Sequence, residues 1–267
     1  EKGHEEQEEV ETKVSFGGSF LERIQPQKRE KIYTLSAQGQ VEAGTNRLLW
    51  TLRIGLVDSQ KYYVIRDIPL FLKVLVHRKP YMIGKHYEND LSWDAFDTAS
   101  QEVLTFLCGL IEEGLSQDLF FPNQGRHLFF PLTFFEQGVE LLMNLEDFHF
   151  EHQITSYENL LFHDLDPDAE LFSFSVKEYP DYFEMEISES ERVNVFYGGA
   201  VLFRKGNLYL LNPKQISLLK EIKELPQEER GRKCLQFDNS DRDRLAACLP
   251  LFGQLGTVSA PERLQIR

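Results

Sequence analysis

The sequence has too little cysteine for a disulfide framework or a cysteine-based zinc site. Its 267 residues include only Cys108, Cys234 and Cys248, and none of the three belongs to a C-x-x-C pair. Each is flanked by apolar residues, which predicts buried free thiols in a reducing compartment. A small secreted scaffold held by disulfides is therefore excluded.

Long hydrophobic runs are also missing. The densest apolar stretch, residues 128–135, is short and is interrupted by Pro131. It falls well below the roughly 18 to 20 residues that a membrane-spanning helix needs. The N-terminus is acidic, whereas a signal peptide begins with a basic region. We therefore expect a soluble, cytoplasmic chain with no membrane partner.

No phosphate-binding loop or nucleophile elbow occurs in the sequence. Gly84-Lys85 is followed by His86, whereas a nucleotide-binding loop ends in Gly-Lys-Ser or Gly-Lys-Thr. Gly198-Gly199 leads into a predicted strand, and no G-x-S-x-G motif is present. Gly84-Lys85 and Gly198-Gly199 are both interpreted as turns. We expect the chain to hold no catalytic residue, no cofactor-binding residue and no metal ligand.

Two groups of polar residues are candidates for a metal site. His149, His152 and His163 lie in one segment beside Glu151 and Asp164, but His149 and His152 point to opposite faces of a strand. Hydrogen-bonded or solvent-facing histidines are favoured over a zinc site. The acidic loop at residues 164–170 lacks the glycine and the later glutamate of a calcium loop, which favours a solvated interdomain loop.

Positive charge is scarce. The chain has 29 Lys and Arg against 43 Asp and Glu, a formal net charge of −14. Six glutamates and Lys2 in the first twelve residues account for −5, so the remainder is still acidic. Such a body is a poor stand-alone DNA-binding surface, because non-specific affinity comes from neutralised phosphates.

Three small basic clusters are interpreted as solvated turns or helix ends, with contact to a phosphate as the alternative for each. They are Lys28, Arg29 and Lys31; His77, Arg78 and Lys79; and Arg230, Arg232 and Lys233. The aromatic pairs Tyr62-Tyr63 and Phe129-Phe130 are interpreted as strand and core residues and not as a platform that stacks bases.

The first half of the chain predicts a sheet followed by helices. Alternating or apolar patterns predict strands at residues 33–41, 48–56 and 61–66. Asp67 and an early proline predict a helix start, and Thr98 with Gln101 predicts a capping box for a helix that ends at Gly114. A third helix is expected from about Thr133, capped reciprocally by Glu136, to about Leu145.

The second half repeats this order. Strands are predicted at residues 171–176, 182–187, 200–204, 208–211 and 233–237. Asn212 and Pro213 predict a helix start, and the last helix is expected near Ser240, with Pro250 bending or ending it.

These patterns predict an α+β fold of antiparallel sheets and short amphipathic helices. We divide the chain into an acidic linker at residues 1–13, a first lobe at 14–165 and a second lobe at 166–267. Phe96-Asp97 and Phe237-Asp238 each lead into a capped helix, so an internal duplication is one interpretation of the two similar lobes. Chance recurrence of common hairpin and helix units is the other.

Two stretches carry a family resemblance. The first includes Leu52-Arg53-Ile54-Gly55, residues 62–68, Phe71-Leu72, Pro80-Tyr81 and Gly84-Lys85; the second includes residues 208–211, 235–237 and 249–252. They resemble the bacterial SWI/SNF helicase-associated domain over roughly residues 28–260. In that family the domain lies between a SWIM zinc-binding segment and two RecA-like motor domains that hydrolyse ATP. The sequence has neither the ligands of a SWIM segment nor a motor's phosphate loop, so the resemblance assigns no catalytic residue here.

The resemblance implies an accessory role. The chain would position or restrain the motor of an ATP-dependent DNA translocase, and its acidic surface would compete with duplex for the motor's DNA channel. ATP with magnesium, zinc and DNA would belong to the parent protein, with direct DNA contact by this segment left open. The alternative is a free-standing adaptor that binds a protein through its aromatic-rich sheet. A hydrolase with dispersed carboxylates is disfavoured, because no positioned nucleophile, base or metal set is visible.

Overall fold

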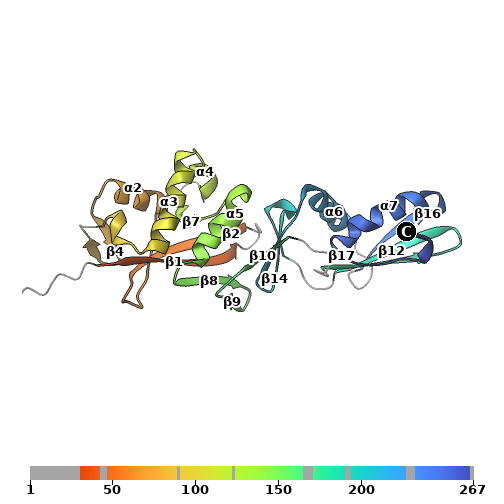
Figure 1. Ribbon diagram of the computed structural model, residues 1–267, viewed down its shortest axis with the longest axis horizontal. Coiled ribbons are helices and arrows are strands. Elements are labelled where there is room, and N and C mark those ends of the chain that lie inside the picture. Colours follow the sequence, from red (N-terminus) through yellow and green to blue (C-terminus); the bar gives the residue numbers. More distant parts are fainter. Residues whose placement is uncertain are drawn as a thin grey trace, which may run out of the picture.

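The computed structural model describes residues 31–42, 47–88, 91–121, 124–164, 171–189, 194–226 and 232–264. The predicted acidic linker at residues 1–13 and the basic residues Lys28, Arg29 and Arg230 lie outside these ranges. Within them the molecule is elongated, with helices on one side of its sheets (Figure 1). Mixed helices and antiparallel-rich sheets confirm the predicted α+β class.

The first sheet is built around a long hairpin. β1 and β2 pair antiparallel over their whole length, with Leu35 opposite Ile54 and Gly39 opposite Trp50. Gly39 is required there, because a Cβ atom would lie 2.3 Å from the Trp50 ring. The strand order is β6-β7-β2-β1-β8-β9, with β3 beside β2. The strands are β1 Tyr33–Glu42, β2 Arg47–Leu56, β3 Tyr63–Val64, β6 Phe120–Phe121, β7 Gln124–Leu128, β8 Asp147–His152 and β9 Thr155–Tyr157.

Helices cover the apolar face of this sheet (Figure 1). They are α2 Ile68–Val76, α3 Thr98–Glu112, α4 Ser116–Leu119 and α5 Phe135–Met143, with 3-10 turns at Trp93–Ala95 and Leu132–Phe134. A small hairpin, β4 Tyr81–Ile83 and β5 His86–Glu88, follows α2.

Local capping explains where these helices begin, and it corrects two predictions. Asp67 accepts a hydrogen bond from the backbone N–H of Leu70, as predicted. The cap of α3 is Asp97 and not Thr98, because the Asp97 carboxylate accepts from the N–H of Ser100 at 2.7 Å. Glu136 does not cap α5 either: no side chain caps this helix, which follows directly from a 3-10 turn after Pro131.

The predicted strand at residues 61–66 is much shorter, since only Tyr63–Val64 pairs with β2. Pairing ends early because the chain turns away at once into α2.

The cysteines are free, as predicted, but they are not buried. Cys248 is exposed and Cys108 and Cys234 are half-buried, because their apolar neighbours along the chain occupy the core positions instead.

A middle sheet joins the two halves of the chain. It contains β10 Leu161–Asp164, β15 Asn207–Leu210, β14 Val201–Arg204 and β13 Asn194–Phe196, in that order. The β14–β15 hairpin turns at Lys205 and Gly206, both with positive φ, which confirms the predicted turn. Val201 and Phe203 of β14 belong to the first core, whereas Leu202 between them belongs to the second. This strand therefore contributes to both cores.

The second half has its own four-stranded sheet, in the order β16-β12-β11-β17. Its strands are β11 Phe172–Glu178, β12 Tyr182–Glu189, β16 Lys233–Asp238 and β17 Gly256–Ser259. α6 Pro213–Glu224 and α7 Arg242–Gly253 cover its apolar face, and 3-10 turns lie at Tyr197–Gly199, Asn239–Asp241 and Glu262–Leu264. Asn212 and Gln215 form a full capping box for α6. α7 continues past Pro250 to Gly253, so the proline does not end it.

The two main sheets share a connectivity. Each contains a hairpin with one further strand on either side. In the first sheet, β7 pairs antiparallel with β2 and β8 pairs parallel with β1. In the second sheet, β16 pairs antiparallel with β12 and β17 pairs parallel with β11. The helix between the flanking strands is α5 in one half and α7 in the other. Phe96-Asp97 leads into α3 and Phe237-Asp238 leads toward α7. By strand order the counterpart of α7 is α5, because α3 precedes β6, so the two Phe-Asp steps do not occupy equivalent positions. Duplication remains a hypothesis that the shared strand order supports, and the predicted lobe boundaries remain predictions.

Candidate functional site

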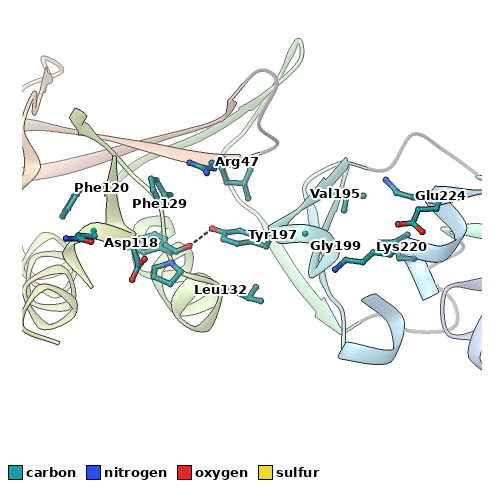
Figure 2. Close-up of a pocket in the computed structure, with 17 residues that line it drawn as sticks. Arg47, Asp118, Phe120, Phe129, Leu132, Val195, Tyr197, Gly199, Lys220 and Glu224 are labelled. Carbon is teal, nitrogen blue, oxygen red and sulfur yellow. Dashed lines mark hydrogen bonds between the residues drawn. The ribbon is translucent and has the colours of Figure 1, made fainter. Parts of the chain in front are cut away.

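A cleft lies where the two halves of the chain meet. It has a volume of about 890 Å³. Figure 2 shows residues of β2, α4 and the loop before α5 on one wall, and residues of β13 and α6 on the other. Tyr197 stands between these walls, so the cleft depends on both halves of the fold.

Tyr197 is held by an unusual stretch of backbone. Tyr197, Gly198 and Gly199 all have positive φ angles, of 52°, 64° and 106°. Such angles are easily adopted by glycine but disfavoured for a tyrosine. The Tyr197 hydroxyl donates a hydrogen bond of 2.7 Å to the carbonyl oxygen of Phe130 (Figure 2). This bond ties the turn before β14 to the segment that enters α5.

Burial determines the chemistry of Tyr197. It raises the pKa of the phenol well above its usual range, so the hydroxyl stays protonated at neutral pH and acts as a donor. The ring also packs at 5.0 Å from that of Phe135. Tyr197 therefore links the two halves of the fold through its hydroxyl and its ring.

The cleft combines apolar residues on one wall with charges of both signs. Phe129, Pro131 and Leu132 line one wall, and Leu132 is 47% exposed. Lys220, Lys223, Arg47, Asp118 and Glu224 also line the cleft. Loss of hydration lowers the pKa of Lys223, and the nearby charge of Lys233 acts in the same direction. The arrangement suits a protein segment with an apolar side chain and flanking polar groups.

A second, polar hollow of about 860 Å³ lies on the first sheet, beside the loop at residues 57–63. Arg53 bonds to Asp147 at 3.0 Å and to the Ser36 hydroxyl at 3.1 Å. His149 Nε2 lies 2.7 Å from the other oxygen of Asp147. Tyr62 also lines this hollow. The pKa of its phenol is raised mainly by burial and further by the negative charges of Asp147 and Glu146. The carboxylate of Asp147 is thus occupied by Arg53 and His149.

The three histidines weighed as zinc ligands have separate partners. His149 and His152 lie on opposite faces of β8, as predicted, and the His152 ring packs against Phe203. His163 is hydrogen-bonded to Asn207 at 2.8 Å. In the described part of the chain, no group of three or more His, Cys, Asp or Glu residues has a geometry that could hold a metal ion. Of the acidic loop, only Asp164 lies in the described ranges.

The remaining predicted positions are turns and surface residues. Gly84-Lys85 is the turn of the β4–β5 hairpin, and Gly198-Gly199 forms the turn that leads into β14, as predicted. His77, Arg78 and Lys79 are exposed at the end of α2. Arg232 pairs with Glu186 at 2.6 Å, and Lys233 donates to the carbonyl oxygens of α6. None of the described helices is long and apolar enough to cross a membrane.

The cleft itself was missed by sequence reasoning. Phe129-Phe130 was interpreted as core, and only Phe130 is fully buried. The available signal was the pair Gly198-Gly199 after a tyrosine, which permits a tight left-handed turn. That signal does not say which distant carbonyl the tyrosine reaches.

The comparison with protein families identifies the class. The chain belongs to the bacterial SNF2 helicase-associated family, whose model matches residues 126–267. The match runs from β7 to the end of the chain and includes the middle sheet, the second sheet and most of the cleft. The stretches at 208–211, 235–237 and 249–252 that suggested the resemblance lie inside it, whereas residues 52–85 lie outside. No curated protein and no solved structure matches the chain significantly.

Proposed function

We propose that this chain is a non-catalytic accessory module that positions and restrains the motor of a bacterial SNF2-family DNA translocase. The observation that carries the proposal is the family match, which spans more than half of the chain. In this proposal ATP and magnesium bind the motor, and zinc binds a separate SWIM segment of the parent protein.

The cleft at Tyr197 is the proposed docking site for a segment of the motor. Its apolar residues supply area whose burial drives association, and its charged residues supply orientation. Because the hydrogen bond from Tyr197 to Phe130 fixes the two walls relative to each other, the cleft is held open before a partner arrives.

A binding measurement tests this docking. Leu132→Asp places a charge on the apolar wall of the cleft and is expected to weaken binding of the purified motor domains by at least about tenfold, roughly the effect of losing one interface hot spot. Ile154→Asp is the matched control, because Ile154 is fully exposed in the β8–β9 turn and does not line the cleft. Equal affinity of the wild type and Leu132→Asp for the motor would reject the cleft as the docking site.

The alternative is a free-standing adaptor that uses the same apolar cleft for an unrelated protein. The apolar residues that line the cleft would contact the partner in either case. The coding sequence after Arg267 separates the two functions. A Gly-Lys-Thr phosphate loop encoded there supports the accessory module, and a stop codon supports the adaptor.

A further inference from the structure

Positive charge is concentrated in one segment of this acidic chain. Residues 61–88, here named the basic segment, contain six lysines and arginines against Asp67 and Glu88. Their net charge is +4 with histidine neutral, while the rest of the chain carries −18. The six cations are Lys61, Arg66, Lys73, Arg78, Lys79 and Lys85, and all of them are exposed.

The basic segment forms one continuous end of the molecule. The Tyr81 ring of β4 packs against Phe71 of α2 with 5.0 Å between ring centroids. The turn of the β4–β5 hairpin lies against Tyr63, because a Cβ atom on Gly84 would fall 2.5 Å from that ring. Figure 1 places α2 and β4 together, at the opposite end of the long axis from the C-terminus. Segments 20 residues apart thus share one surface.

These cations are not neutralised within the described chain. Elsewhere, Arg53 pairs with Asp147, Arg263 with Glu178, and both Lys177 and Arg232 with Glu186. Of the two acids in the basic segment, Glu88 is paired with Lys31 and Asp67 caps α2. No ion pair joins any of the six cations to a carboxylate of a described residue. Among the described residues, these six charges therefore have no acidic partner.

Aromatic and apolar side chains are exposed on the same end. Tyr87 is 66% exposed. Tyr63 lies in β3, which confirms its prediction as a strand residue, but it is 41% exposed and so is not a core residue. Met82 stands opposite Tyr87 in the hairpin and is 49% exposed. Exposed aromatic rings among uncommitted cations are the combination that lies against sugars and bases while the cations meet phosphates.

We propose that the basic segment contacts the phosphate backbone of DNA, with Arg78, Lys79 and Lys85 facing phosphates and Tyr87 packing beside them. The inference rests on the proposed function, since a DNA translocase brings its accessory module close to duplex. The acidic remainder of the chain repels the same polyanion, so the separation of charge directs DNA to this end alone.

The test is fluorescence anisotropy of a labelled DNA duplex with the whole 267-residue chain, titrated between about 50 and 200 mM salt. Binding is expected at low salt, and log K should fall linearly with log salt. Arg78→Glu with Lys79→Glu should weaken binding by about tenfold or more and should lower the salt slope by about 0.9 for each lost contact. Tyr87→Ala should weaken binding with no change of slope, because it removes no charge.

The matched control is Lys214→Glu with Arg244→Glu, which makes the same change of net charge on exposed positions of α6 and α7. Equal weakening by the control would overturn the inference, because net charge alone would then explain the binding. Absence of duplex binding at low salt would overturn it too, as would capture by anionic phospholipid vesicles without capture by DNA. Circular dichroism confirms that each variant is folded.

This measurement uses no motor, so its outcome is separable from that of the proposed function. DNA binding at the basic segment without docking to the motor would reject the proposed function alone. Docking to the motor with no DNA binding would reject this inference alone.

Discussion

At the scale of single residues, two glycines with opposite surroundings show where the backbone tolerates a side chain. Gly256 pairs with Phe172 in the parallel β11–β17 contact, and a Cβ atom there would lie 1.9 Å from the Phe172 carbonyl oxygen. Gly109 lies inside α3 with nothing within 4 Å of its Cβ position. One position excludes any side chain, and the other has room for a methyl group.

The two alanine variants should therefore change stability in opposite directions. Gly256→Ala is expected to lower the free energy of unfolding by about 3 kcal/mol, because backbone strands must separate. Gly109→Ala should raise it by about 0.5–1 kcal/mol, because alanine favours the helix. Urea denaturation measures both. An equally stable Gly256→Ala protein would show that β17 does not pair with β11 in this register.

At the scale of elements, the start of α3 shows that a capping pattern can predict the helix correctly and still select the wrong N-cap residue. The sequence predicted Thr98 as the cap, whereas Asp97 holds the free N–H of Ser100. The Ser100 hydroxyl in turn accepts from the backbone N–H of Leu35 at 2.7 Å, which ties the helix start to β1. Tertiary contact thus selected one of two adjacent residues that both cap helices well.

Capping variants distinguish the two residues. Asp97→Ala is expected to lower the free energy of unfolding by about 1 kcal/mol, the usual cost of losing an N-cap. Thr98→Ala should change it by less than about 0.5 kcal/mol, since Thr98 is exposed and helical. Thermal or urea unfolding of both proteins gives the comparison, and a larger loss from Thr98→Ala would favour the capping box predicted from sequence.

Elements fixed by neighbouring residues were predictable, and elements fixed by distant ones were not. The β14–β15 hairpin follows from Lys205-Gly206-Asn207, and α6 follows from Asn212 and Pro213, because turns and caps are local. The parallel pairings of β1 with β8 and of β11 with β17 escaped prediction. Each joins strands separated by about a whole half of the fold, so no short pattern records it.

The candidate cleft escaped prediction for the same reason. Tyr197 and Phe130 are 67 residues apart, and neither has a neighbour that signals the other. The basic segment was only partly seen. His77, Arg78 and Lys79 stood out as a cluster, but Lys85 and Tyr87 join them only through the packing of the β4–β5 hairpin.

At the scale of the whole molecule, the cleft, the basic segment and the acidic surface have separate proposed roles. The middle sheet contributes to both cores, so the cleft at Tyr197 and the basic segment are held in one elongated body. The proposed roles are docking to a motor at the cleft, contact with DNA at the basic end, and repulsion of DNA elsewhere. Restraint of the motor follows if the acidic surface occupies the motor's DNA channel until duplex displaces it.

ATP hydrolysis by the motor, alone and linked to this chain, measures that restraint most directly. The linked protein should hydrolyse ATP more slowly without DNA, should need more duplex for half-maximal activity, and should lose this difference as salt screens the acidic surface. Identical basal rates and identical DNA stimulation for the two proteins at every salt concentration would contradict the proposal.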